Sequence, residues 1–137
     1  MSNFKTVGFS LFASLCVTLT TYTASVQADE GERLVAALCD SAKTDDRRTI
    51  RKKLDTVNLR LEKIYDDVRC GSEGSLLRVA TKAGALDAAK YIATKLNKND
   101  LLRAEDDGIS IIQFAEQLVT AGDSSKQAFV DLYNSQS

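Results

Sequence analysis

A short segment occurs twice in this chain, and the repetition limits the folds that the sequence can adopt. Residues Ser75–Ala80 read SLLRVA and residues Ser110–Ala115 read SIIQFA, 35 positions apart. An Ala-Gly pair follows each copy, and a second amphipathic segment comes after each pair. Self-similarity at such a period indicates stacked units of supersecondary structure, each too small to bury its own apolar face alone.

A weaker copy precedes these two. Leu34–Ala37 reproduces the Leu-x-x-Ala spacing of Leu77–Ala80, with Asp45–Leu54 as its partner segment. The longer distance to the second copy places an insertion of about nine residues around Asn58–Arg69. We therefore expect three units in the chain.

Apolar residues recur every three or four positions in each unit, which predicts pairs of amphipathic helices. The sequence contains no proline, so we expect continuous helices joined by glycine and Asn/Asp turns. The expected pairs are 32–43 with 44–57, 75–83 with 86–96, and 110–121 with 125–133. Asn58–Arg69 is compatible with a short helix or with an extended connection. The predicted fold class is all-α.

One copy of the repeat resembles a known family. Gly108–Ala115 is similar to the signature that opens the first helix of an ankyrin repeat, Gly-x-Thr-Pro-Leu-His-x-Ala. Lys82–Ile92 resembles the Gly-His-Leu-Glu-Val-Val-Lys-Leu-Leu segment of the same family. The resemblance implies a short solenoid of about three helix pairs, which one disulfide would staple.

The chain departs from the ankyrin signature at two positions. Leu76 and Ile111 replace the proline, and Arg78 and Gln113 replace the histidine. The hydrogen-bond network that rigidifies each ankyrin turn is therefore expected to be missing. The block Cys70–Ala80 also resembles an uncharacterised family of small secreted bacterial proteins, and this second resemblance implies no activity.

The first 28 residues have the layout of a secretory signal peptide. Lys5 precedes an uncharged, mostly apolar stretch from Thr6 to Thr23, and Ala24–Ala28 ends in small residues before an acidic pair. Cleavage after Ala28 would remove Cys16 and leave a helical domain, 29–137, in the periplasm or outside the cell. Retention as an uncleaved membrane anchor is the alternative, since 18 residues lie at the lower edge of spanning length.

Cys39 and Cys70 are the only cysteines after the predicted cleavage site. An even pair in an oxidising compartment predicts an intramolecular disulfide. Closing a loop of about 32 residues stabilises a fold by roughly 3 to 4 kcal/mol in the chain-entropy estimate. Two buried free thiols are the alternative. A redox or metal role lacks support because the chain has no Cys-x-x-Cys spacing.

The sequence lacks the common catalytic and cofactor-binding motifs. It contains no histidine, which removes the commonest general base and the Ser-His and Cys-His pairs. The acidic pairs Asp45-Asp46, Asp66-Asp67 and Asp106-Asp107 lie beside turns or basic residues, and no calcium loop or glycine-rich nucleotide cradle occurs. We expect a protein that is not an enzyme and holds no metal or cofactor. A hydrolase or transferase with an unfamiliar site is an alternative.

The strongest local charge feature is Arg47–Lys53, which has five basic residues in seven. A helix here would bury Ile50 and Leu54 and expose the bases. The exposed bases would form a solvated face, or a patch for an acidic partner or an anionic membrane surface. The overall net charge of -1 does not favour binding to nucleic acid.

These observations predict a secreted or periplasmic, non-catalytic protein-interaction module whose protein partner is unknown. The predicted contact residues are Arg47, Arg48, Arg51 and Lys52 of the basic run, with Arg78 and Gln113 as exposed residues of the concave repeat face. The alternative is a small periplasmic stress protein or holdase-type chaperone, which would expose apolar surface conditionally.

Overall fold

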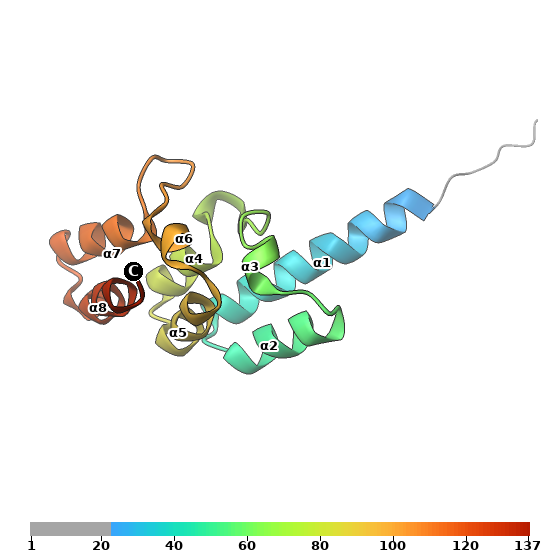
Figure 1. Ribbon diagram of the computed structural model, residues 1–137, viewed down its shortest axis with the longest axis horizontal. Coiled ribbons are helices and arrows are strands. Elements are labelled where there is room, and N and C mark those ends of the chain that lie inside the picture. The colour runs from blue at the N-terminus through green and yellow to red at the C-terminus, as the bar shows by residue number, and fades with distance from the viewer. Residues whose placement is uncertain (1–22) are drawn as a thin grey trace, which may run out of the picture.

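The computed structural model describes residues 23–137, and their side chains from residue 29 onward (Figure 1). The predicted signal segment up to residue 22, with Lys5 and Cys16, lies outside the described residues. The first helix begins at Thr23 and runs through the predicted cleavage position after Ala28. None of the described helices is long and apolar enough to cross a membrane.

The described chain is built from helices. Residues 23–137 contain no β-strand, which confirms the all-α prediction. The α-helices are α1 Thr23–Lys43, α2 Arg47–Thr56, α3 Leu61–Ile64, α4 Leu76–Ala83, α5 Leu86–Lys95, α6 Lys98–Leu102, α7 Ile111–Thr120 and α8 Gln127–Gln136, with 3-10 turns η1 Gly71–Glu73 and η2 Ser124–Lys126. The six longer helices correspond to the three predicted pairs, but α1 begins at Thr23, nine residues before its predicted start at Glu32. The connection Asn58–Arg69 contains the short helix α3 within irregular backbone.

The six longer helices form two layers (Figure 1). Helices α1, α4 and α7 pack side by side in one layer, and α2, α5 and α8 pack side by side in the other. Each first helix also packs against the second helix of its own pair. The three pairs are therefore stacked in chain order, and the short helices α3 and α6 lie in the two connections between pairs.

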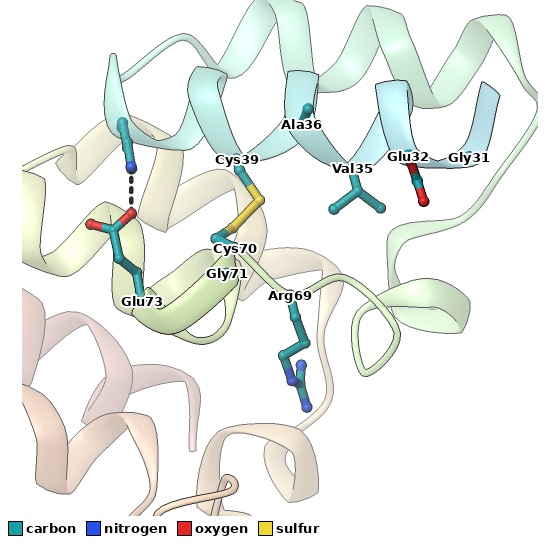
Figure 2. A pocket seen from close by; sticks show the side chains of 10 residues that line it. Gly31, Glu32, Val35, Ala36, Cys39, Arg69, Cys70, Gly71 and Glu73 are labelled. Atoms are coloured by element: carbon teal, nitrogen blue, oxygen red, sulfur yellow. Dashed lines mark ion pairs between the residues drawn. A yellow bond between two sulfur atoms is a disulfide. The ribbon is translucent and has the colours of Figure 1, made fainter. Parts of the chain in front are cut away.

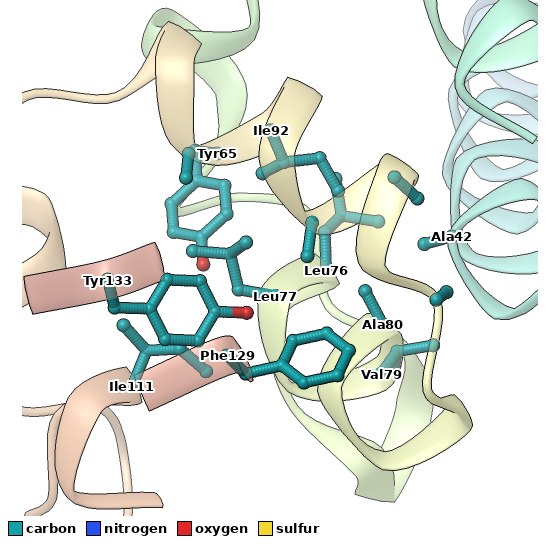
Figure 3. Packing of buried hydrophobic residues seen from close by; sticks show 14 of the residues in the cluster. Ala42, Tyr65, Leu76, Leu77, Val79, Ala80, Ile92, Ile111, Phe129 and Tyr133 are labelled. Atoms are coloured by element: carbon teal, nitrogen blue, oxygen red, sulfur yellow. The ribbon is translucent and has the colours of Figure 1, made fainter. Parts of the chain in front are cut away.

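The centre of the core is helix α4, which has neighbours on both sides of the stack. Leu76 and Leu77 are fully buried and meet Ile92 of α5 and Phe129 and Tyr133 of α8 (Figure 3). A buried hydroxyl needs a hydrogen-bond partner. The Tyr133 hydroxyl has one, because it lies 2.8 Å from Thr81 Oγ1 on α4.

The repeat seen in the sequence also holds in the turns before α4 and α7. The backbone N–H of Cys70 donates to the Gly74 carbonyl at 2.8 Å, and that of Glu105 donates to the Ile109 carbonyl at 2.9 Å. The serine that follows each turn caps its helix by accepting from the N–H three residues on. Cys70 and Glu105 therefore occupy the same place in two equivalent turns, 35 residues apart.

The first copy aligns differently from the sequence prediction. Helices α2 and α5 begin 39 residues apart, and the turn residues Asp45 and Gly84, both with positive φ, have the same spacing. This offset pairs Leu38, rather than Leu34, with Leu77, and both are fully buried. The predicted alignment was wrong by one helical turn, because residues four apart lie on the same helix face. The first and second units are offset by 39 residues, and the second and third units by 35. The insertion is therefore four residues long, and not about nine as predicted.

Charged side chains join neighbouring pairs at helix ends. Asp45 Oδ1 accepts a hydrogen bond from the Ala88 N–H, at 2.7 Å, in the first turn of α5. Lys126 Nζ donates to the Lys82 carbonyl, at 3.3 Å, in the last turn of α4. A carboxylate at a helix N-terminus and an ammonium at a C-terminus both complement the helix dipole. These contacts fix the spacing between adjacent pairs.

Candidate interaction surface

The predicted disulfide is present. Cys39 of α1 and Cys70 before η1 are bonded, with their Cα atoms 5.6 Å apart. Arg78 follows Cys39 by 39 residues, and Glu105 follows Cys70 by 35 residues, which are the two repeat offsets. Arg78 and Glu105 therefore occupy in the second unit the positions that the two cysteines occupy in the first. Arg78 Nε lies 2.9 Å from Glu105 Oε2. A covalent bond in the first unit and an ion pair in the second thus connect the first helix to the turn that follows its pair.

Arg78 is buried, so the prediction that it is an exposed contact residue was wrong. Its Nη2 donates to Asp107 Oδ1 at 2.7 Å and to the Ile109 carbonyl at 3.0 Å, and Nη1 also pairs with Asp107. The guanidinium carbon lies 4.7 Å from the centre of the Phe114 ring, within the range of a cation–π contact. The carboxylates that pair with the buried Arg78 belong to Glu105 and Asp107, in a turn almost 30 residues further along the chain.

A polar network different from the ankyrin one holds the turn before α7. Ser75 Oγ donates to Glu105 Oε1 at 2.7 Å, while Glu105 Oε2 faces Arg78. The hydrogen bond from Arg78 holds the pKa of the Asp107 carboxyl below its ordinary value. Burial raises the pKa of the neighbouring Tyr65 hydroxyl. The turn after α6 is therefore locked to α4 by charge-assisted hydrogen bonds.

Gln113 is exposed on α7, as predicted. Its Oε1 accepts from the Ser110 N–H at 2.9 Å, which completes a capping box at the start of the helix. Because α7 and α2 lie in different layers, Gln113 and the basic run do not share one surface.

The four predicted contact residues of α2 are all exposed, and we call Arg47, Arg48, Arg51 and Lys52 the basic face. The helix presents them because Ile50 and Leu54 are buried on its opposite side, as predicted. Asp46 caps the helix, and its hydrogen bonds from Thr49 lower the pKa of the Asp46 carboxyl. Arg51 makes a solvated ion pair with Asp55 at 3.7 Å.

A hollow of about 350 Å³ adjoins the basic face. Leu59, Tyr91 and Lys95 line it together with Asp55, which also borders the basic face. Leu59 is 40% exposed, and Lys95 Nζ lies 5.5 Å from the centre of the Tyr91 ring. Sequence reasoning missed this hollow because α5 and the end of α2 are distant in the chain, and no motif links them.

A second concavity lies between α1 and the turn that carries Cys70, and we call it the α1 groove (Figure 2). It measures about 520 Å³. Val35 points into it, Ala36 and the disulfide border it, and the Lys43–Glu73 ion pair closes one end. Its walls are mainly apolar, and the sequence analysis did not anticipate it.

Four carboxylates of the described structure have structural partners. Asp45 and Asp46 cap helices, Asp107 holds Arg78, and both oxygens of Glu105 face Ser75 or Arg78. Among the described residues, no group of three His, Cys, Asp or Glu side chains is placed to hold a metal ion.

Residues 38–102 match the model of a family described as a protein of unknown function, DUF3718. The matched segment contains the two cysteines of the disulfide, the basic face and Arg78. No curated protein and no solved structure matched the chain significantly.

Proposed function

We propose that this chain is a non-catalytic interaction module, an ankyrin-like solenoid of three helix pairs that binds an acidic protein through the basic face of α2. The stacking of the pairs in chain order supports the solenoid. The disulfide supports action in an oxidising compartment, in line with a secreted or periplasmic protein. In solenoids, function resides in the exposed surface of the stack.

The observation that carries this proposal is the contrast between two sets of cations. Arg78 and Lys126 are buried and used internally. Arg47, Arg48 and Lys52 are exposed and form no ion pair within the described part of the chain. Several like charges on one short helix repel one another. Arg51 alone of the basic face has an intramolecular partner, Asp55, and an acidic protein would relieve the repulsion among the four cations.

The neighbouring hollow supplies the apolar component that a specific contact needs. Interfaces gain most of their affinity from a few aromatic or basic anchors in a desolvated centre, surrounded by a polar rim. Tyr91 and Leu59 provide such a centre beside Arg51 and Lys52. An acidic segment carrying one apolar side chain fits this combination.

The test is capture of the partner from native periplasmic extract by the oxidised protein, residues 29–137, at low and moderate salt. One variant carries glutamate at Arg47, Arg48, Arg51 and Lys52. The matched control carries glutamate at four exposed lysines elsewhere, Lys63, Lys82, Lys90 and Lys98. We expect one stoichiometric partner that the control retains and the basic-face variant loses, with binding that weakens as salt rises.

The same experiment tests the holdase alternative. Val57 and Leu102 are 45% and 50% exposed, which is the observation in favour of a chaperone. A holdase would retain many partly unfolded proteins, and the basic-face variant would retain them equally. Such a result would contradict the interaction-module proposal.

A further inference from the structure

The hollow beside the basic face contains a cation that no described carboxylate pairs with. Two carboxylates line the hollow, and each has a basic partner within the chain. Asp55 pairs with Arg51 at 3.7 Å, and Glu62 pairs with Arg60 at 2.8 Å. Lys95 also lines the hollow and forms no ion pair with any described residue. The hollow therefore carries one uncompensated positive charge.

Tyr91 connects this charge to the basic face. Lys95 Nζ lies 5.5 Å from the centre of the Tyr91 ring, one turn earlier on α5. The ring attracts the ammonium group, but a carboxylate partner is still lacking. Burial and then the Asp55 carboxylate raise the pKa of the Tyr91 hydroxyl, while Arg51 lowers it. Tyr91 therefore lies within electrostatic range of the basic face on one side and of Lys95 on the other.

Apolar surface lies between these charges. Leu54 and Leu61 form part of the wall and are each 3% exposed, whereas Leu59 is 40% exposed. Asn58, with a positive φ of 52°, turns the chain before Leu59, and the Leu59 N–H donates to the Leu54 carbonyl at 3.0 Å. The volume of about 350 Å³ accommodates a leucine or phenylalanine side chain. The hollow therefore suits an apolar side chain that has an acidic residue beside it.

We infer that Tyr91 and Lys95 determine which acidic segments the basic face accepts, by selecting an apolar residue that has acids on both sides. The apolar side chain enters the hollow against Tyr91 and Leu59. The acids on one side of it pair with the basic face, and the acid on its other side pairs with Lys95. This inference rests on the proposed function, because it concerns the same acidic partner, and it adds specificity-determining residues on α5.

The second acid follows from the electrostatics of Lys95. An apolar segment that covered this ammonium group would take it out of water without a counter-charge, which is costly. A carboxylate at the same place forms a charge-assisted hydrogen bond with it. A basic residue there would meet a like charge, so segments of the wrong sequence are rejected. Lys95 thus discriminates among segments that are all acidic enough to bind α2.

Synthetic peptides test the inference, with binding to the oxidised protein measured by fluorescence anisotropy. The reference peptide contains four glutamates, a leucine and a fifth glutamate. One relative carries alanine in place of the leucine, and the other carries glutamine in place of the fifth glutamate. We expect the alanine peptide to bind roughly tenfold more weakly than the reference, because a leucine side chain is no longer buried. The glutamine peptide should bind severalfold more weakly.

Variants of α5 locate these two preferences. Tyr91→Ser should abolish the preference for leucine, and Tyr91→Phe, which keeps the ring, should retain it. Lys95→Gln should abolish the preference for the fifth glutamate and reduce the salt dependence of binding. Lys90→Gln is the matched control, because Lys90 is exposed on the same helix but does not line the hollow. It should retain both preferences, and circular dichroism checks that every variant keeps its helix content.

The outcomes separate this inference from the proposed function. If all three peptides bind the unmodified protein equally and the basic-face variant binds none, the inference is overturned and the proposed function stands. If charge reversal of the basic face leaves peptide binding unchanged, both are overturned. Preferences that persist in Tyr91→Ser and Lys95→Gln, or the absence of binding by any peptide, also overturn the inference.

Discussion

Arg78 carries a full positive charge into the stack, and two carboxylates from a distant turn compensate it. Truncation by Arg78→Ala would leave the largely buried Glu105 without its counter-charge. We expect a loss of about 3 to 5 kcal/mol in the free energy of unfolding, which urea titration followed by circular dichroism measures. Gln113→Ala changes an exposed residue at the corresponding repeat position and should cost at most about 1 kcal/mol. Equal losses would show that the buried ion pair is not a special source of stability.

Asp107 makes the stability of this network depend on pH. The hydrogen bond from Arg78 keeps the pKa of the folded-state carboxyl below that of the unfolded chain. Such a group stabilises the fold above its unfolded pKa, and the contribution disappears as the pH falls through the folded value. We therefore expect melting temperatures to decline below about pH 4, and Asp107→Asn to melt earlier at neutral pH with a shallower acid decline.

The neighbouring Asp106 provides the control for this pH dependence. Its exposed carboxylate lies 3.5 Å from Arg69 and makes no contact with Arg78 in the described structure. Asp106→Asn should therefore keep the acid decline of the unmodified protein. If Asp107→Asn also keeps it, the hydrogen bond to Arg78 does not govern acid stability.

At the scale of elements, two kinds of bond connect the first helix of a pair to the turn that follows that pair. The disulfide connects α1 to the turn before α4, and the Arg78–Glu105 ion pair connects α4 to the turn before α7. The first connection is four residues longer than the second, so its turn has more freedom to lose on folding. A covalent staple suits the longer connection.

This comparison predicts the effect of removing the disulfide. We expect the double variant Cys39→Ser, Cys70→Ser to lose roughly 3 to 4 kcal/mol of unfolding free energy, the loop-closure contribution. Denaturant titration with and without a reducing agent measures the loss. Reduction should lower the stability of the unmodified protein to that of the variant and leave the variant unchanged. A variant as stable as the oxidised protein would contradict the staple.

The turn between α1 and α2 acts on a neighbouring helix through Asp45. This residue adopts positive φ and caps α5 through the Ala88 N–H. Asp45→Ala should cost roughly 1 to 2 kcal/mol, since alanine loses the cap and disfavours this backbone conformation. Asp45→Asn should cost less, because asparagine tolerates positive φ and keeps an acceptor oxygen. Thermal unfolding distinguishes the two, and equal losses would contradict the capping role.

The elements could be predicted from the sequence because the signals for them are local. Apolar spacing predicted the three helix pairs, the serine caps predicted the starts of α4 and α7, and the pair of cysteines predicted the disulfide, but the start of α1 was predicted nine residues too late. The register of the first unit could not be found from apolar spacing, since Leu34 and Leu38 share a helix face. The equivalence of Asp45 and Gly84, which sets the correct register, rests on their positive φ, and only the structure shows that. The burial of Arg78 and both concavities depend on contacts between distant segments, which no local pattern encodes.

The two ends of the whole molecule differ. The outer side of α7 is a polar stripe of exposed side chains at helical spacing, Gln113, Glu116, Gln117 and Thr120. A polar outer face is what the terminal unit of a stack needs for solubility. The α1 end has an apolar groove instead. The described stack therefore presents a polar face on α7 and an apolar groove beside α1.

The last pair is also required for the core, although it contains few of the charged features described above. Phe129 and Tyr133 of α8 are buried against α4 and α5, and Tyr133 supplies the partner of the Thr81 hydroxyl. Without the last pair, α4 would lose its neighbour on one side, and a stack of two units is below the number that repeat proteins need. We therefore expect residues 29–102 to lack a cooperative unfolding transition.

Circular dichroism during heating and dispersion of amide proton shifts in NMR spectra measure this directly. The matched control ends after Tyr133 and removes only the last four residues, 134–137, none of which belongs to the buried core. That control should unfold cooperatively near the temperature of the longer protein. If residues 29–102 unfold cooperatively instead, α1 to α6 form an independent domain, and the last pair must be an addition that the core of the molecule does not need.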